Sequence, residues 1–195
     1  NATEMGRSGK LNQPFALSAL KAVNQFVRQS DHMTLLLDTQ ARDHYGRWLG
    51  HIFNDQGESL EQYLLQQGLA YHVAIPPNLK LAECFALVEQ HARDNQLGLW
   101  GDNGLPPVAA QFVRQGGYHR VQGRVTAVHM GKHWRLVLDD KVSVMIYSEH
   151  QHRFSKAWFS PLVGRQLEVQ GWLYNAKRQW RIKLETPYGV ELLSF

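Results

Sequence analysis

Residues 38–70, DTQARDHYGRWLGHIFNDQGESLEQYLLQQGLA, contain the turn, strand and helix around which the first half of the chain is organised. DHYGR at 43–47 predicts a tight turn, because aspartate favours the start of a turn and Gly46 readily adopts the positive φ that such a turn needs. Apolar alternation over residues 48–53 predicts a strand, and the polar residues 54–57 end it.

A capped helix follows this strand. Ser59 and Gln62 form a Ser-x-x-Gln capping box ahead of leucines at helical spacing. Gly68 is expected to end the helix after about two and a half turns, since glycine is the usual residue just past a helix.

Three more elements are predicted in the first half. Residues 79–96 form a helix after the Pro76-Pro77 break, and Cys84 is expected to be a packed residue of it. MTLLLD at 33–38 is typical of a buried strand and is expected to pair with residues 47–53. Residues 14–30 predict a helix with a core-facing stripe at Phe15, Leu17, Leu20, Val23, Phe26 and Val27.

Charge divides the chain into two halves. Residues 1–104 hold eight Lys/Arg against eleven Asp/Glu, whereas residues 105–195 hold thirteen against six. The second half, at about +7, suits a polyanionic partner, although the same surplus also fits a merely solubilising surface. A single cysteine excludes an intramolecular disulfide, and no apolar run reaches the ~18 residues of a membrane span.

The charge balance changes at GDNGLPP, residues 101–107, where Gly, Asn and Pro interrupt regular structure. We predict one domain over residues 1–103, a linker over 104–117 and a second domain over 118–195. Alternating runs in the second domain predict strands at 118–129, 133–139, 141–148, 166–174 and 179–185. With a short helix between the third and fourth, this order resembles an OB-fold.

Four blocks of the first domain resemble the thermonuclease family, the staphylococcal-nuclease-like domains. They are DHYGRWLGHIF, LEQYLLQQGLA, PPN at 76–78 and NQLGLWGDN at 95–103. The resemblance implies a small five-stranded barrel with three helices that hydrolyses phosphodiester bonds in DNA and RNA with calcium. The predicted fold class is α+β, in which a nuclease-type OB barrel without its first strands precedes a second, mostly β, OB-like barrel.

The resemblance also assigns roles to single residues. Glu4 matches the family's general base, Arg47 one of two catalytic arginines, and Tyr45 a tyrosine that contacts substrate, while Asn1 stands at a calcium-ligand position. The family carries its calcium-ligating aspartate and other arginine further upstream, so we expect an incomplete calcium site and little or no activity from the 195 residues. Either a longer parent protein or the natural loss of the catalytic sheet would explain this. Two structural alternatives stay open. In the first, Arg47 only pairs with Asp43 or Asp38 at a strand end, and in the second, Glu4 is a solvated terminal residue.

Alternation in the second domain predicts two faces. Facing inward are Val121, Val125, Val142, Val144, Ile146, Leu167, Val169 and Leu173, with Trp134 and Trp180 also assigned to the core. Facing outward are Arg120, Arg124, Tyr147, Trp172, Tyr174, Arg181 and Lys183. Aromatic rings among cations suit single-stranded nucleic acid, because bases stack on the rings while the cations meet phosphates. Alternatively, Trp172 and Tyr174 cover the neighbouring domain.

The leading interpretation is therefore a nuclease-family protein whose basic second domain holds single-stranded DNA or RNA. A non-catalytic nucleic-acid-binding protein and an OB-like protein-docking module remain alternatives. The incomplete first barrel has an open sheet edge, which predicts a possible homodimer. The resemblance is compatible with a secreted or periplasmic protein.

Overall fold

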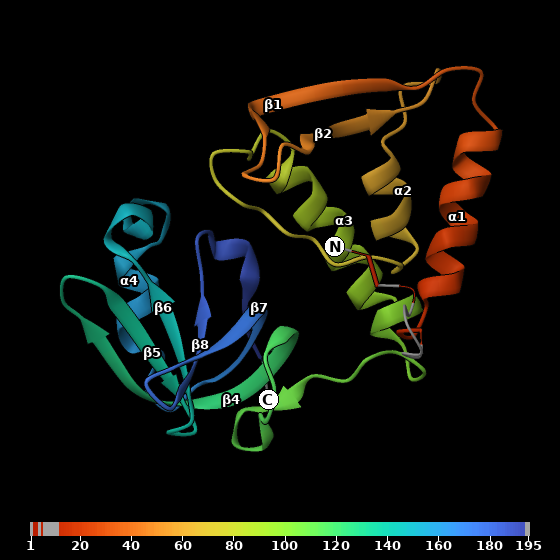
Figure 1. The fold of residues 1–195 in the computed structure, drawn as a ribbon. Coiled ribbons are helices and arrows are strands. Elements are labelled where there is room, and N and C mark those ends of the chain that lie inside the picture. The colour runs from red at the N-terminus through yellow and green to blue at the C-terminus, as the bar shows by residue number, and fades with distance from the viewer. Residues whose placement is uncertain (1, 4, 6–11, 194–195) are drawn as a thin grey trace. The chain divides into compact units, whose positions relative to one another are not determined.

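The computed structural model describes residues 2–3, 5 and 12–193, so the predictions for Asn1 and Glu4 lie outside the described residues. The chain forms two compact units (Figure 1), one made of Asn1–Val73 and Pro77–Leu105 and the other of Ala74–Pro76 and Pro106–Phe195. The predicted domain boundaries stay a prediction. Within the stretch predicted as a linker, residues 108–112 form a short strand and a 3-10 turn.

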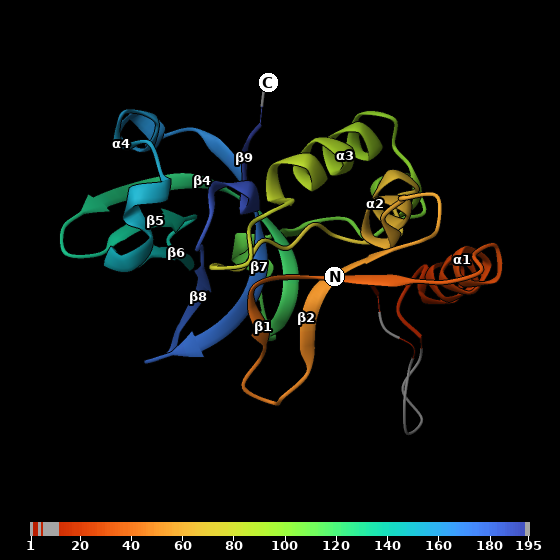
Figure 2. The same ribbon diagram turned by 90° about the horizontal axis from the view of Figure 1, so that it is seen from above.

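The described residues of the first unit form three helices and one strand pair. In chain order they are α1 (Ala16–Arg28), β1 (Thr34–Arg42), β2 (Trp48–Phe53), α2 (Leu60–Gln66) and α3 (Ala82–Asp94), followed by a 3-10 turn at Gly98–Trp100. β1 and β2 are antiparallel, and the helices stand beside one another with α2 between α1 and α3 (Figures 1 and 2). Because α2 contacts both other helices and β2, it is the centre of this unit.

Both predicted ends of α2 are confirmed. Ser59 Oγ accepts a hydrogen bond from the backbone N–H of Gln62 at 3.2 Å, which satisfies one of the free donors of the first turn. Gly68 has a φ of +65°, and a Cβ built there would lie 2.1 Å from the carbonyl oxygen of Leu97. Glycine is therefore required both by the backbone conformation and by the approach of the segment that follows α3.

Several predicted buried positions in the first unit are wrong. In α1 the buried residues are Ala16, Ala19, Ala22 and Phe26, while Leu17, Leu20 and Val27 of the predicted stripe are exposed. In β1, Leu35 and Leu36 are 45% and 42% exposed, because β1 pairs only with β2 among the described residues. Cys84 is exposed as well, since the buried side of α3 is formed by Ala82, Phe85, Glu89 and Ala92.

The second unit is a closed β-barrel, visible in Figures 1 and 2. Its strands are β3 (Val108–Ala109), β4 (Gly117–Met130), β5 (Trp134–Leu138), β6 (Val142–Ile146), β7 (Gln166–Ala176), β8 (Gln179–Lys183) and β9 (Val190–Leu192). The order β4-β5-β6-β8-β7 closes because β7 also pairs with β4, and β3 and β9 extend the sheet. Between β6 and β7 lie a 3-10 helix (Ser148–Arg153), the short α4 (Lys156–Phe159) and a second 3-10 turn (Ser160–Leu162). All five predicted strands are confirmed.

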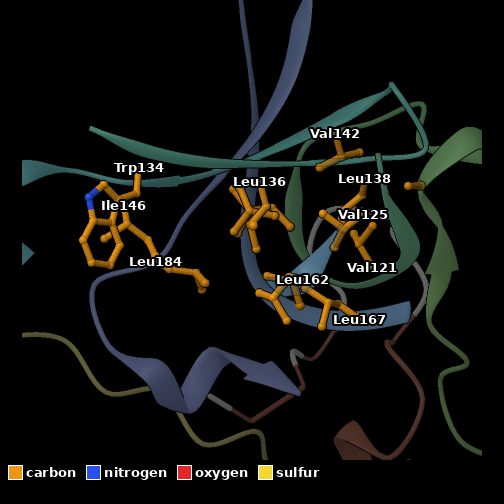
Figure 3. Packing of buried hydrophobic residues seen from close by; sticks show 14 of the residues in the cluster. Val121, Val125, Trp134, Leu136, Leu138, Val142, Ile146, Leu162, Leu167 and Leu184 are labelled. Atoms are coloured by element: carbon orange, nitrogen blue, oxygen red, sulfur yellow. The ribbon is translucent and has the colours of Figure 1, made fainter. Parts of the chain in front are cut away.

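The barrel interior is filled with aliphatic side chains (Figure 3). Val121, Val125, Leu136 and Leu138 face Leu162 and Leu167 there. All eight side chains predicted to face inward are buried, as is Trp134, whereas Trp180 is partly buried against the cluster. None of the helices in the described part of the chain is long and apolar enough to cross a membrane.

Candidate functional site

The turn between β1 and β2 is closed by the carboxylate of Asp43. Its Oδ1 accepts hydrogen bonds from the backbone N–H groups of Tyr45 and Arg47, both at 2.9 Å. Its Oδ2 accepts a hydrogen bond from Arg47 Nε at 2.6 Å. Gly46 has a φ of +81°, as the turn prediction requires. One carboxylate therefore fixes both the backbone of the turn and the guanidinium that follows it.

These hydrogen bonds also control the charge of Asp43. Desolvation raises the pKa of its carboxyl group, but the hydrogen bonds from the side chain and backbone of Arg47 and from the backbone of Tyr45 lower the pKa more. The net pKa lies below its ordinary value, so Asp43 is ionised at neutral pH. It stays a permanent anionic partner for Arg47.

The structure brings the predicted residues Arg47 and Tyr45 together at this turn. The Arg47 side chain is 72% exposed and its Cζ lies 5.2 Å from the centroid of the Tyr45 ring, which is itself part of a 73% exposed residue. A guanidinium has five N–H donors. Arg47 can therefore stay paired with Asp43 and still meet phosphate oxygens from solvent.

A second cation and aromatic ring lie on the same hairpin, and sequence reasoning missed them. Arg42 and Trp48 are opposite each other in the β1–β2 register, and the Arg42 Cζ lies 3.6 Å from the centroid of the Trp48 ring. Arg42 Nη1 also donates a hydrogen bond to the carbonyl oxygen of Gly46 at 2.6 Å. The signal that could have revealed the pair is its symmetric position, the last residue of one strand and the first of the next.

The Pro-Pro-Asn segment and Lys80 contact the backbone of β1. The Asn78 side chain pairs with the backbone of Gln40, accepting its N–H at 2.8 Å and donating to its carbonyl oxygen at 2.9 Å. Lys80 Nζ donates to the carbonyl oxygen of Leu37 at 3.0 Å. This segment therefore occupies part of the β1 edge and explains why an asparagine follows the two prolines.

Asp38 joins β1 to the start of α3. It accepts hydrogen bonds from the backbone N–H groups of Thr39 at 2.6 Å and Lys80 at 3.1 Å. Burial raises the pKa of Asp38, and these hydrogen bonds, together with the Thr39 hydroxyl and the nearby Lys80, lower it below its ordinary value. His51 on β2 lies between two carboxylates, 3.8 Å from Asp38 Oδ2 and 3.3 Å from Glu61 Oε1, so it links the hairpin to α2.

The family model described as staphylococcal nuclease homologue matches residues 1–102, more than half of the chain. The chain belongs to the staphylococcal nuclease homologue family. The matched region includes the whole β1–β2 hairpin, the Pro-Pro-Asn segment and all three helices of the first unit.

Two proteins of Bacillus subtilis (strain 168) are similar to this chain. The chain is 35% identical over 94 residues to endonuclease YncB, which covers 47% of this chain and 44% of that protein. It is also 35% identical over 94 residues to the SPbeta prophage-derived endonuclease YokF, covering 31% of that protein. The chain thus spans less than half of the length of either relative.

The family typically depends on calcium, and the described residues do not fit such a site. They contain no group of three or more His, Cys, Asp or Glu side chains that could hold a metal ion. The carboxylates of Asp38 and Asp43 are already used as hydrogen-bond acceptors. Asn1, the calcium-ligand position that the resemblance implies, lies outside the described residues.

In the second unit, four of the predicted binding residues gather over β6, β7 and β8. The hydroxyl groups of Tyr147 and Tyr174 lie 3.2 Å apart, and Lys183 Nζ lies 5.8 Å from the centroid of the Tyr147 ring. Arg181 is opposite Tyr174 in the β7–β8 register. Burial and the hydrogen bond with Tyr147 raise the pKa of Tyr174 to about 12, so its hydroxyl is neutral and can donate.

The other three predicted residues lie elsewhere on the barrel. Arg120 is held by Glu168, with Nε 2.7 Å from Oε1 and Nη2 2.9 Å from Oε2. Glu168 is buried, so this guanidinium is committed to an internal ion pair. Trp172 packs edge-on against Tyr118 with ring centroids 5.0 Å apart, and Arg124 is exposed beside Asp139, whose Oδ1 accepts its backbone N–H at 3.0 Å.

Proposed function

We propose that this protein is a nuclease that hydrolyses phosphodiester bonds of DNA or RNA. The observation that carries the proposal is an exposed guanidinium, Arg47, which Asp43 holds at the end of the turn just before β2. The chain belongs to a nuclease family, and the two relatives that it matches are named endonucleases. A planar guanidinium meets phosphate oxygens through two parallel hydrogen bonds. Arg47 is therefore suited to hold the charge that grows on the phosphoryl oxygens.

The proposed reaction is a displacement by water. The water oxygen bonds to phosphorus, one ester P–O bond breaks, one water proton passes to a general base, and the leaving oxygen takes a proton from solvent. Glu4 is our candidate for the base, by family resemblance, and Tyr45 for a contact to the substrate. In the family, calcium would supply further charge stabilisation. The described residues include no group of side chains that could hold the ion, so no step of the proposed reaction is assigned to it.

Arg47 variants test this proposal. We expect Arg47→Ala to lower the single-turnover cleavage rate of a labelled single strand about a hundredfold, because removing one preorganised donor typically costs this much. Arg47→Lys should recover only part of the rate, since an ammonium cannot form the paired hydrogen bonds. Arg28→Ala, which removes an exposed arginine of α1, is the control for charge loss. Equal rates for Arg47→Ala and Arg28→Ala would rule Arg47 out.

For the 195-residue chain itself we propose that turnover in calcium is absent or nearly so. It supplies a residue at only one of the two arginine positions that the resemblance implies, and each lost donor lowers the rate. Cleavage of single-stranded DNA as fast as that of an intact family member would contradict this.

A second candidate function is binding of single-stranded nucleic acid by the barrel. The closed order β4-β5-β6-β8-β7, with α4 between β6 and β7 in the chain, supports an OB-like assignment. The group of Tyr147, Tyr174, Arg181 and Lys183 favours it, together with the exposed turn residues Lys177 and Arg178. Docking of a protein on the barrel is the alternative that a lack of nucleic-acid binding would favour.

Association of two copies through the hairpin is a separate proposal. β1 and β2 pair only with each other among the described residues, and Leu35 and Leu36 are exposed beside that edge. A monomeric mass from light scattering at high concentration would exclude it.

A further inference from the structure

The Arg42–Trp48 pair forms an ordered, solvent-exposed surface that the proposed chemistry at Arg47 does not use. The Arg42 guanidinium stacks on the Trp48 ring at 3.6 Å and is also bonded to the Gly46 carbonyl oxygen. Trp48 nevertheless remains 55% exposed. Two long side chains are thus held in one geometry without being buried, so their conformational entropy is already lost before a ligand binds.

This pair stands directly beside the turn that carries Arg47 and Tyr45, because β1 ends at Arg42 and β2 begins at Trp48. Arg42 and Trp48 are opposite each other in the register, so their side chains share one face of the hairpin. The hairpin tip therefore presents two cations and two exposed aromatic rings.

The local charge points to a polyanion. Residues 42–48 contain two arginines and one aspartate, in a half of the chain with eight Lys/Arg against eleven Asp/Glu. Both arginines of this segment therefore lie beside the exposed rings of Tyr45 and Trp48. A free phosphate would need only the cations, whereas a nucleic acid strand also offers bases that stack on aromatic rings.

We propose that Arg42 and Trp48 form a second contact for single-stranded nucleic acid, in which an unpaired base stacks on Trp48 and a neighbouring phosphate meets Arg42. This inference rests on the proposed nuclease function and adds to it a specificity-determining surface. The contact binds the strand beyond the phosphate held at Arg47. It favours single strands, because bases in a duplex are already stacked and paired.

Binding of a labelled oligothymidylate of about 15 nucleotides tests the proposal, measured by fluorescence anisotropy on the whole chain with a chelator present to keep the strand intact. Trp48→Ala should weaken binding about tenfold, and Trp48→Phe should restore most of it, since stacking needs a ring. Arg42→Ala should weaken binding several-fold and reduce the salt dependence by about one phosphate contact. A duplex of the same length should respond less to Trp48→Ala.

Two matched controls separate this effect from loss of charge or of exposed apolar surface. They are Arg28→Ala in α1 and Leu87→Ala in α3, both exposed and both expected to bind like the wild type. If Trp48→Ala and Arg42→Ala stay within twofold of the wild type while Arg47→Ala weakens binding or cleavage, the inference is overturned and the nuclease proposal stands. If the wild-type chain binds no oligonucleotide, both are overturned.

Discussion

In the barrel, β5, β6, β7 and β8 each have a partner strand on both sides, whereas β1 and β2 of the hairpin each have one among the described residues. The consequence appears in the side chains: Leu136 and Val144 of the barrel are fully buried, but Leu35 and Leu36 of β1 remain nearly half exposed. Burial of apolar surface stabilises the barrel. The hairpin depends instead on polar contacts such as those of Asp43.

The two regions also differ in where their polar groups are used. At the hairpin, Arg42, Arg47 and Tyr45 are exposed and held by short-range contacts. In the barrel, Arg120 is bound to the buried Glu168. A cation that is ordered but still exposed can bind a ligand at little cost, whereas an internal ion pair must first be broken. This difference makes the hairpin the better candidate for the chemistry.

The largest expected effect is on the barrel core. Leu136→Ala should lower the free energy of unfolding of the second unit by about 3–5 kcal/mol, because Leu136 is fully buried and its loss leaves a cavity. Leu36→Ala, the same truncation on β1, should cost less than about 1 kcal/mol. Hydrogen exchange followed by mass spectrometry in urea reports each unit separately. Equal losses would contradict the contrast between the two sheets.

A smaller effect is expected from acid in the first unit. Burial lowers the pKa of His72 from 6.5 to about 4. His72 in the folded unit therefore resists protonation down to about pH 4, whereas His72 in the unfolded chain takes up a proton below pH 6.5. Stability is fully present above pH 6.5 and is lost as the pH falls to about 4, by about 3 kcal/mol at most. His72→Phe should flatten this dependence in unfolding experiments between pH 7 and pH 4. An unchanged acid limb in that variant would assign the loss to other groups.

The smallest effect is expected at the second candidate site for nucleic acid, on the barrel. Arg181→Ala and Lys183→Ala should each weaken oligonucleotide binding by about threefold, with a salt dependence reduced by about one contact. Arg165→Ala, which removes an exposed arginine before β7, is the matched control. Affinity unchanged by both variants would leave the hairpin as the binding element and favour protein docking on the barrel.

Local features were predicted correctly where neighbouring residues decide them. Ser59 caps α2, Gly68 ends it at a positive φ, and Asp43 and Gly46 form the predicted turn. Each of these depends on hydrogen bonds or dihedral angles within a few residues. The strands of the barrel were found for a similar reason, because alternation along one strand identifies its buried face.

Errors arose where burial depends on a distant partner. The apolar stripe predicted for α1 placed Leu17 and Leu20 in the core. In the structure Ala19 and Ala22 face the rest of the unit instead. Small residues allow the close approach of another helix, and this is decided by packing. Cys84 was assigned to the wrong side of α3 because its neighbour Phe85 defines the buried face.

The sequence by itself determined the turn at 43–47, the capped helix α2, the alternating strands of the barrel and the family, because these are written in residues close together in the chain. Tertiary structure decided which cations remain available. Asn78 reaches Gln40 across 38 positions, Glu168 reaches Arg120 across 48, and Arg42 meets Trp48 only through the register of two strands. Such contacts depend on how the chain returns upon itself, and no local pattern specifies that path.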